Sequence, residues 1–162
     1  MNDYLAALDR LEEQHIEALG AIHRCHNDVD AIARAGVAAE FGTSEADRLR
    51  ALEEDLAALN DQFSEHMRFE EQQLLPILNR YAAQIVTNGL VFQHQAILAS
   101  IGDLIEAVRA LRGTPASETA MGVERARVQA KLQDFQSLLE AHTEVQRVIF
   151  ELAREAHRSA SS

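Results

Sequence analysis

The chain has 162 residues, about the length of one domain, and a domain of this size buries around 70% of its unfolded surface. Its 15 basic and 26 acidic residues give a net charge of -11, so no basic surface is expected for nucleic-acid phosphates. No apolar run approaches the roughly 20 residues that span a bilayer, and no signal peptide is recognisable. The single cysteine, Cys25, cannot form an internal disulfide, and a cytoplasmic protein is therefore expected.

The composition favours helices, because alanine, leucine, glutamate, arginine and glutamine dominate it. Apolar residues at spacings of three and four predict four amphipathic helices. The first runs from about Asp3 to Ala35, and the second from an N-cap at Thr43 or Ser44 to about Tyr81. A break is predicted at Thr87, Asn88 and Gly89. The third helix follows this break and ends at Gly113 to Pro115, and the fourth includes Val128 to Ala153. Pro76 should bend the second helix or loosen its last turns, because it removes a backbone donor.

Four such helices joined by short loops predict an all-α fold, an up-down-up-down antiparallel four-helix bundle. The bundle is expected to occupy residues 1–158, and residues 159–162 are expected to form a polar C-terminal tail. Nothing in the sequence indicates strands or a second domain.

The second helix carries polar residues where its buried face calls for leucines. Its apolar seam comprises Leu49, Leu52, Leu56, Leu59 and Phe63. The same spacing continues to His66 and Glu70, although burying either side chain alone costs several kcal/mol, on the order of 2–7 for a neutral polar group. The substitution of polar for apolar residues at buried positions requires a chemical reason.

Each of the other three helices also places one histidine on its seam. These are His15, His94 and His142. In an antiparallel bundle, the loop near residue 42 places His15 opposite His66 and Glu70, and the loop near residue 115 places His94 level with His142. Whether the two pairs meet at one level depends on the connection between Tyr81 and Gly89.

Metal binding would explain this arrangement. Imidazole and carboxylate are ligands for iron, manganese and zinc, and bundle cores commonly hold metals between facing helices. His66 and Glu70 are four residues apart and share one helix face, so His66 can hold one metal while Glu70 bridges towards a second. A metal also supplies the positive charge that a lone buried glutamate lacks.

Four segments of the chain resemble hemerythrin-like domains of the His-His-Glu, or HHE, type. The segments are EQHIEAL with His15, EHMRFEEQQLLP with His66 and Glu70, QHQAIL with His94, and AHTEVQRVIF with His142. The second is the most specific, since it nearly reproduces the family's histidine, three residues, Glu-Glu, two apolar residues and proline. The resemblance covers essentially the whole chain. It implies a bundle holding a non-heme di-iron centre, with His15 and His66 on one iron, His94 and His142 on the other, and Glu70 bridging both.

The sequence departs from the family at Gln146, where the fourth helix should carry a second bridging carboxylate. A glutamine offers a neutral oxygen and is at most a weak terminal ligand. Two divalent metals then need a solvent-derived bridge or another acid. Glu12, one turn before His15, is a candidate, although Leu11 competes for the inward orientation. A site with a single metal is also compatible with this ligand set.

The neighbours of these residues are expected to have structural roles. Phe63, Phe69 and Phe92 are predicted to pack in the core and keep the site dry. Glu71 and Glu144 are predicted to be rotated away from the seam by the helix geometry.

The resemblance implies binding or sensing of O2 or of another diatomic or oxidant such as NO, or the handling of iron. A sensor would need a separate protein partner, because the chain shows no attached signalling domain. No motif for a nucleophile or a phosphate-binding loop is present, which favours a binding protein over a turnover enzyme. The alternative is a helical interaction module with a degenerate or single-metal site. The oligomeric state stays open.

Overall fold

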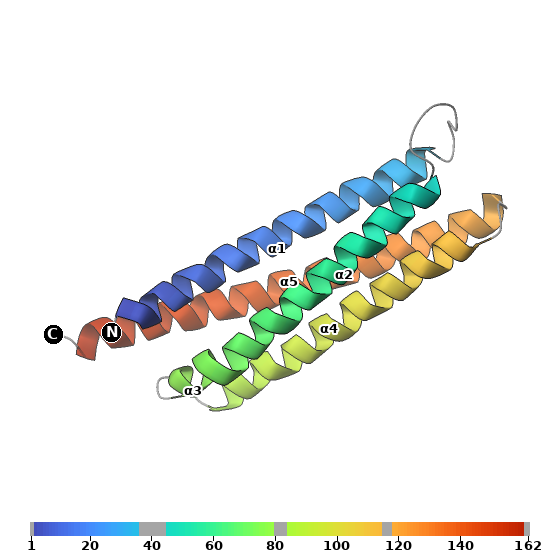
Figure 1. Ribbon diagram of the computed structural model, residues 1–162. Helices are drawn as coiled ribbons and strands as arrows, with labels where there is room; N and C mark the ends of the chain where they lie inside the picture. The colour runs from blue at the N-terminus through green and yellow to red at the C-terminus, as the bar shows by residue number, and fades with distance from the viewer. Residues whose placement is uncertain (1, 36–44, 80–83, 115–117, 161–162) are drawn as a thin grey trace.

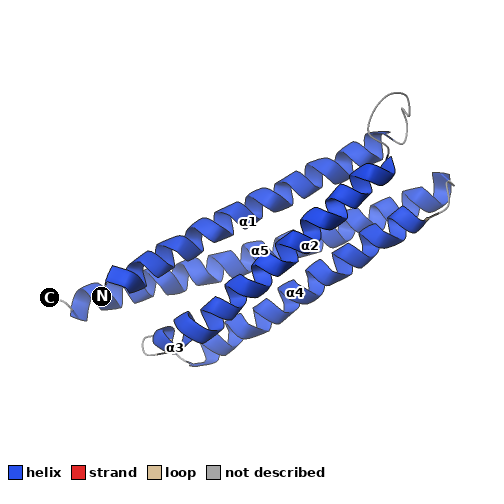
Figure 2. Ribbon diagram, in the orientation of Figure 1, coloured by secondary structure: helices blue, strands red, loops and turns tan. Residues whose placement is uncertain are grey.

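The computed structural model describes residues 2–35, 45–79, 84–114 and 118–160, and these form an antiparallel bundle (Figure 1). Its elements are helix α1 (Asn2–Ala35), helix α2 (Glu45–Phe69), a π-helical turn (Glu70–Leu74), helix α3 (Leu75–Leu78), helix α4 (Gln84–Gly113) and helix α5 (Glu118–Ala160). The neighbouring pairs are α1 with α2, α2 with α4, α4 with α5 and α5 with α1. The described part contains no strand (Figure 2). The predicted all-α, up-down-up-down four-helix bundle is thus confirmed.

No helix within the described ranges is long and apolar enough to cross a membrane. The observed ends of α1 and α4 agree with the sequence pattern, and α5 extends further than expected. It continues through Ser159 and Ala160, so half of the expected polar tail is helical. The predicted N-cap at residues 43 and 44 and the predicted end near residue 81 lie outside the described residues.

The predicted break at Thr87, Asn88 and Gly89 is wrong, because all three residues lie inside α4. The Thr87 side chain is buried and donates a hydrogen bond to Asn79 Oδ1 over 2.6 Å. This bond ties α4 to the end of α3. Such tertiary contacts readily outweigh the weak helix preference of threonine, asparagine and glycine.

A π-helical turn interrupts the helix that begins with α2, just before Pro76. The N–H of Leu75 donates to the carbonyl oxygen of Glu70, five residues earlier. Pro76 lacks an N–H, and its ring crowds the carbonyl of Gln72, so regular α-helical bonding cannot continue through this stretch. The prediction that Pro76 disturbs the last turns is confirmed, and the disturbance is a π turn that contains Glu70, a kind of irregularity often found at functional sites.

Two separate apolar clusters fill the interior. The larger one lies towards the end where α1 turns into α2 and includes Leu56, Phe63 and Phe135, while the smaller one includes Leu78 and Phe150. Along every long helix, the seam residue between the two clusters is polar. The bundle therefore has two apolar halves with a polar layer between them.

The expected role of the three phenylalanines is correct only for Phe63. It is buried and packs edge-on against Phe135, with 5.9 Å between the ring centroids. Phe69 is 44% exposed and Phe92 is 72% exposed, so neither is core packing. Phe92 precedes the buried His94 by two residues, which is more than half a helical turn, and its side chain therefore faces outward.

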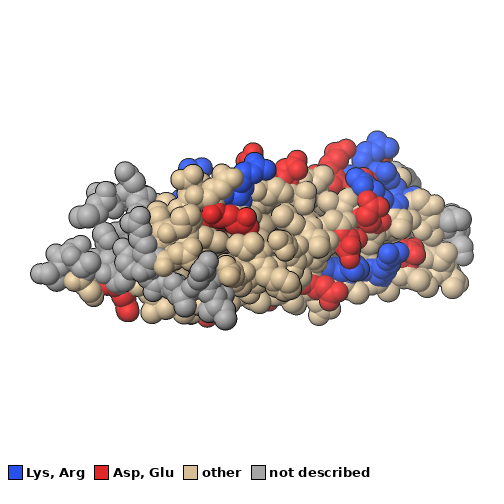
Figure 3. Space-filling model, turned by 90° about the horizontal axis from the view of Figure 1, so that it is seen from below, with Lys and Arg blue, Asp and Glu red and all other residues tan. Residues whose placement is uncertain are grey.

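Charged side chains gather towards the end of the bundle where α4 is followed by α5, and a largely uncharged surface lies beside them (Figure 3). Ion pairs at this end join Arg109 to Glu53 and Lys131 to Asp103, at 2.7 and 2.8 Å. Exposed pairs of this kind contribute about 0–1 kcal/mol each. The apolar clusters, rather than these pairs, hold the helices together.

We predict that Phe135→Ala lowers the free energy of unfolding by about 3–5 kcal/mol, because it removes a fully buried ring from the larger cluster. Phe92→Ala is the matched control and should change it by less than about 0.5 kcal/mol. Urea denaturation followed by circular dichroism measures both. Equal losses in the two variants would contradict the described core.

Candidate metal centre

The polar layer brings together one histidine from each long helix and one glutamate. His15 comes from α1, His66 from α2, His94 from α4 and His142 from α5, and all four are buried. Glu70, at the start of the π turn, is 0% exposed. The two helix pairs therefore meet at one level, and the four imidazoles surround a single carboxylate.

The five side chains divide into two groups that share Glu70. One contains His15, His66 and Glu70, the other Glu70, His94 and His142, and the ligand atoms within each group lie within 4.8 Å of one another. His66 Nε2 lies 2.9 Å from Glu70 Oε1, and His94 Nε2 lies 2.9 Å from Glu70 Oε2. Oε1 thus faces His66 and, at 3.9 Å, His15, while Oε2 faces His94, whose group also contains His142, and this division is the geometry of a bridging ligand.

Several of these atoms lack a hydrogen-bond partner despite their short contacts. In the described part of the chain, Glu70 Oε1, His94 Nε2 and His142 Nε2 are buried and have no partner of good hydrogen-bond geometry. His15 Nε2 and His66 Nε2 lie only 2.9 Å apart. Buried polar atoms are seldom left unsatisfied in native proteins. Atoms that converge on a common point without bonding well to one another are the donor set that a cation requires.

Side-chain oxygens contact the Nδ1 atom of three of the imidazoles, on the side of the ring away from the cluster. The contacts from histidine Nδ1 are His66 to Gln14 Oε1 at 2.8 Å, His94 to Glu71 Oε1 at 2.8 Å, and His142 to Gln93 Oε1 at 3.2 Å. An Nδ1–H that donates to oxygen leaves the Nε2 lone pair free, and such contacts are usual around metal-binding histidines. All three histidines therefore present Nε2 to the interior.

Sequence reasoning missed these three oxygen-bearing partners. Gln14 and Gln93 directly precede seam histidines, and each accepts from the histidine of the neighbouring helix rather than from its own. Glu71 is partly exposed, as its predicted rotation requires, yet its carboxylate reaches His94. The sequence signal for two of these partners is the Gln-His pair, which occurs at Gln14-His15 and again at Gln93-His94. Glu144 faces outward as predicted and pairs with Arg147.

Gln146 and Glu12 behave differently from each other. Gln146 is buried in the layer, and its Nε2 donates to Glu70 Oε2 over 2.6 Å, while its Oε1 has no partner among the described residues. Glu12 lies outside the cluster, because Leu11 takes the buried position and Arg154 of α5 pairs with the Glu12 carboxylate at 2.8 Å. The only carboxylate between the two histidine pairs in the described structure is Glu70.

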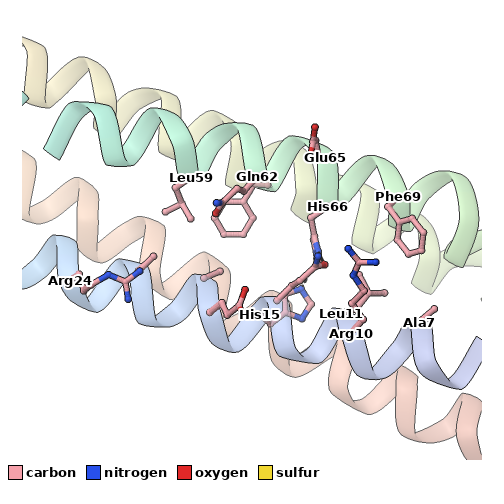
Figure 4. Close-up of a pocket in the computed structure, with 15 residues that line it drawn as sticks. Ala7, Arg10, Leu11, His15, Arg24, Leu59, Gln62, Glu65, His66 and Phe69 are labelled. Atoms are coloured by element: carbon pink, nitrogen blue, oxygen red, sulfur yellow. Dashed lines mark hydrogen bonds between the residues drawn. The ribbon is translucent and has the colours of Figure 1, made fainter. Parts of the chain in front are cut away.

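A groove between α1 and α2 leads to one side of the cluster (Figure 4). Its volume is about 620 Å³, and both His15 and His66 line it. His94 and His142 do not line it. Among the described residues, the two groups of ligands therefore differ in access, since the groove reaches the His15 and His66 side while His94 and His142 are enclosed.

The protonation of the cluster is set by burial and by Glu70. Burial, together with the neighbouring histidines, lowers the pKa of His15 to about 4 and that of His142 to about 3. Burial alone would raise the pKa of Glu70, but contacts with His66 and His94 outweigh it and hold that pKa well below its usual range. Burial would lower the pKa of His94, yet Glu70 and Glu71 raise it. Two neutral imidazoles beside an ionised carboxylate are what a cation requires.

We predict that protein stripped of metal loses stability as the pH falls from about 7 towards about 4.5. His15 and His142 take up protons in the unfolded chain below a pKa near 6.5, but resist them in the fold, so acid favours unfolding by an amount on the order of a few kcal/mol. His94 has a raised pKa, so its protonation stabilises the fold fully below about pH 6.5 and this stabilisation is lost as the pH rises above that value. His94 therefore does not offset the loss of stability between about pH 6.5 and 4.5. Urea denaturation across this range gives the slope, which His142→Leu should reduce. Unchanged stability on acidification would contradict the described environments.

Comparison with known proteins agrees with this geometry. The family model described as Hemerythrin HHE cation binding domain matches residues 6–156. No curated protein and no solved structure matches the chain. The match spans all four long helices and all five clustered side chains, and the chain belongs to the hemerythrin HHE cation-binding domain family.

Proposed function

We propose that the protein binds two non-heme iron ions and uses them to bind or sense O2 or another small oxidant such as NO. The observation that carries the proposal is the shared carboxylate. Glu70 presents one oxygen to His15 and His66 and the other to His94. A carboxylate placed in this way between imidazoles suits two cations better than one.

In this proposal, each half of the cluster has its own ligands. His15 and His66 would hold the first ion, His94 and His142 the second, and Glu70 would bridge them. Gln14 and Gln93 would keep His66 and His142 in the tautomer that presents Nε2. Non-heme iron in such a site supplies reversible coordination and electron exchange with diatomic molecules.

Glu71 supports the second half of the site by supplying charge. Two divalent ions would face only one negative ligand, because position 146 carries a neutral amide. Glu71 places a second carboxylate 2.8 Å from the far side of the His94 ring. A carboxylate that accepts from a ligating histidine raises the basicity of that ligand. It would partly replace the charge that Gln146 lacks.

The groove would give a small oxidant its route to the first half. His15 and His66 lie at its inner wall, whereas the other two histidines are enclosed. Exchange of small molecules would therefore occur on the His15 and His66 side. The enclosed half would have no comparable route for exchange, because His94 and His142 do not line the groove. A sensor of this type would act through a separate protein partner.

One contact supports a second candidate, a helical interaction module with a single metal. Gln146 donates to Glu70 Oε2 over 2.6 Å, which already satisfies one oxygen of the would-be bridge. A single ion held by His15, His66 and Glu70 Oε1 would leave that hydrogen bond intact. The two candidates differ in the number of metals that each chain binds.

Metal analysis and optical spectra of protein purified without chelator test the proposal. We expect about two irons per chain and an absorption change when the reduced protein meets air. Gln146→Glu should tighten binding of the second ion, because it adds a carboxylate beside Glu70. One ion per chain in both proteins would favour the second candidate, and metal-free protein with unchanged helicity would refute iron binding.

We predict that Glu71→Gln weakens binding of one of the two ions by about tenfold, as loss of an outer partner typically does, with stability largely retained. Glu144→Gln is the matched control, because Glu144 is an exposed glutamate that pairs with Arg147 and is not a member of the cluster. Competitive titration with a chromogenic chelator measures both. Equal metal affinity in the two variants would show that Glu71 does not support metal binding.

A further inference from the structure

The groove between α1 and α2 is much larger than a diatomic ligand needs. Its volume is about 620 Å³, whereas one water molecule takes up about 30 Å³ in the liquid. Volumes of about 300–1,000 Å³ are typical of sites for organic molecules. Access for O2 or NO therefore leaves most of this space unexplained.

The lining of the groove combines apolar side chains with exposed polar ones. Between His15 and Arg24 the apolar part is formed by Ala18 and Ala21 from α1 and by Leu59 and Phe63 from α2, and the exposed residues Glu17 and Gln62 also line this stretch. Small residues on α1 face large ones on α2, which leaves space between the helices. This part of the groove suits a narrow apolar chain.

Arg24 closes the apolar stretch with a positive charge. Its Nη1 lies 3.7 Å from the point where a Cβ on Gly20 would stand, so the guanidinium folds back along α1, as Figure 4 shows. Arg24 is exposed and has no ion-pair partner among the described residues, whereas Arg109 and Arg154 are paired. An unpaired guanidinium at the end of an apolar groove is suited to a carboxylate.

The acidic residues of the groove are exposed, so solvent screens their charge. Glu17 and Glu65 also line it, and both are exposed. Figure 4 shows the Glu65 side chain pointing away from α1 and from the space between the helices. Arg10 lines the groove on the other side of His15 and adds a second positive charge.

We propose that this groove binds an organic carboxylate with an unbranched apolar body. The carboxylate pairs with Arg24, and the body lies over Ala21, Leu59 and Phe63. The Arg24 guanidinium lies beside Gly20, and five residues of helix, about 7.5 Å along the axis, separate Gly20 from His15, so an eight-carbon chain reaches the His15 and His66 side of the cluster. The proposal deepens the proposed function by naming a ligand for its open half, and its last step rests on that function.

Octanoate is the probe, and isothermal calorimetry is measured on protein stripped of metal and on protein loaded with zinc. Octanoate should bind in both states, and 1-octanol, which lacks the charge, should bind about three- to fivefold more weakly, as expected for an exposed ion pair. Arg24→Gln should weaken octanoate binding by the same factor of about three to five. Arg68→Gln is the matched control, because Arg68 is an exposed arginine of α2 outside the groove, and it should change binding less than about twofold.

A second variant tests the position of the apolar body. Ala21→Leu fills the stretch between the helices and should abolish octanoate binding while circular dichroism and melting stay as in the parent. Equal losses from Arg24→Gln and Arg68→Gln, or binding unaffected by Ala21→Leu, would overturn the proposal.

Cobalt-loaded protein separates this proposal from the proposed function. If both hold, octanoate should change the visible spectrum of bound cobalt, since its far end reaches the side of His15. Octanoate binding to protein that takes up no metal would refute only the metal site. Metal uptake without octanoate binding would refute only the assignment of the groove.

Discussion

The structure depends on one interaction, the enclosure of the Glu70 carboxylate by four imidazoles. A fully buried carboxylate is costly unless charge and hydrogen bonds compensate it. Here the compensation comes from every long helix, because each supplies one histidine to the same layer. The layer therefore fixes the level of all four helices relative to one another. A shift of any one of them would leave part of the buried cluster without its partners.

The surrounding fold serves this layer in three ways. The two apolar clusters exclude water from either side of the layer, and their packing holds the four long helices around it. The π turn before Pro76 begins at Glu70, so that Glu70 and Glu71 approach the same imidazole of His94 from its two nitrogens. The gap between α1 and α2 leaves one half of the layer accessible. Rigidity on one side and access on the other are what a site for a small exchangeable ligand requires.

The sequence predicted the bundle and the five clustered residues, because three-four periodicity determines which face of each helix is buried. It could not predict the contacts of Gln14, Gln93 and Glu71, which depend on the rotation and separation of neighbouring helices. The buried hydrogen bond of Thr87 kept α4 intact where local preference indicated a break. Phe92 was misplaced for a simpler reason, since its angular position relative to His94 excludes it from the core. Glu12 lies outside the layer as well, because it pairs with Arg154.

Diffraction from crystals of the iron-loaded protein, recorded at the iron absorption edge, tests the central claim most directly. We expect two anomalous peaks on either side of the Glu70 carboxylate, one beside His15 and His66 and one beside His94 and His142. A single peak would show that Glu70 does not bridge two metals, and the absence of any peak at this layer would contradict the metal centre altogether.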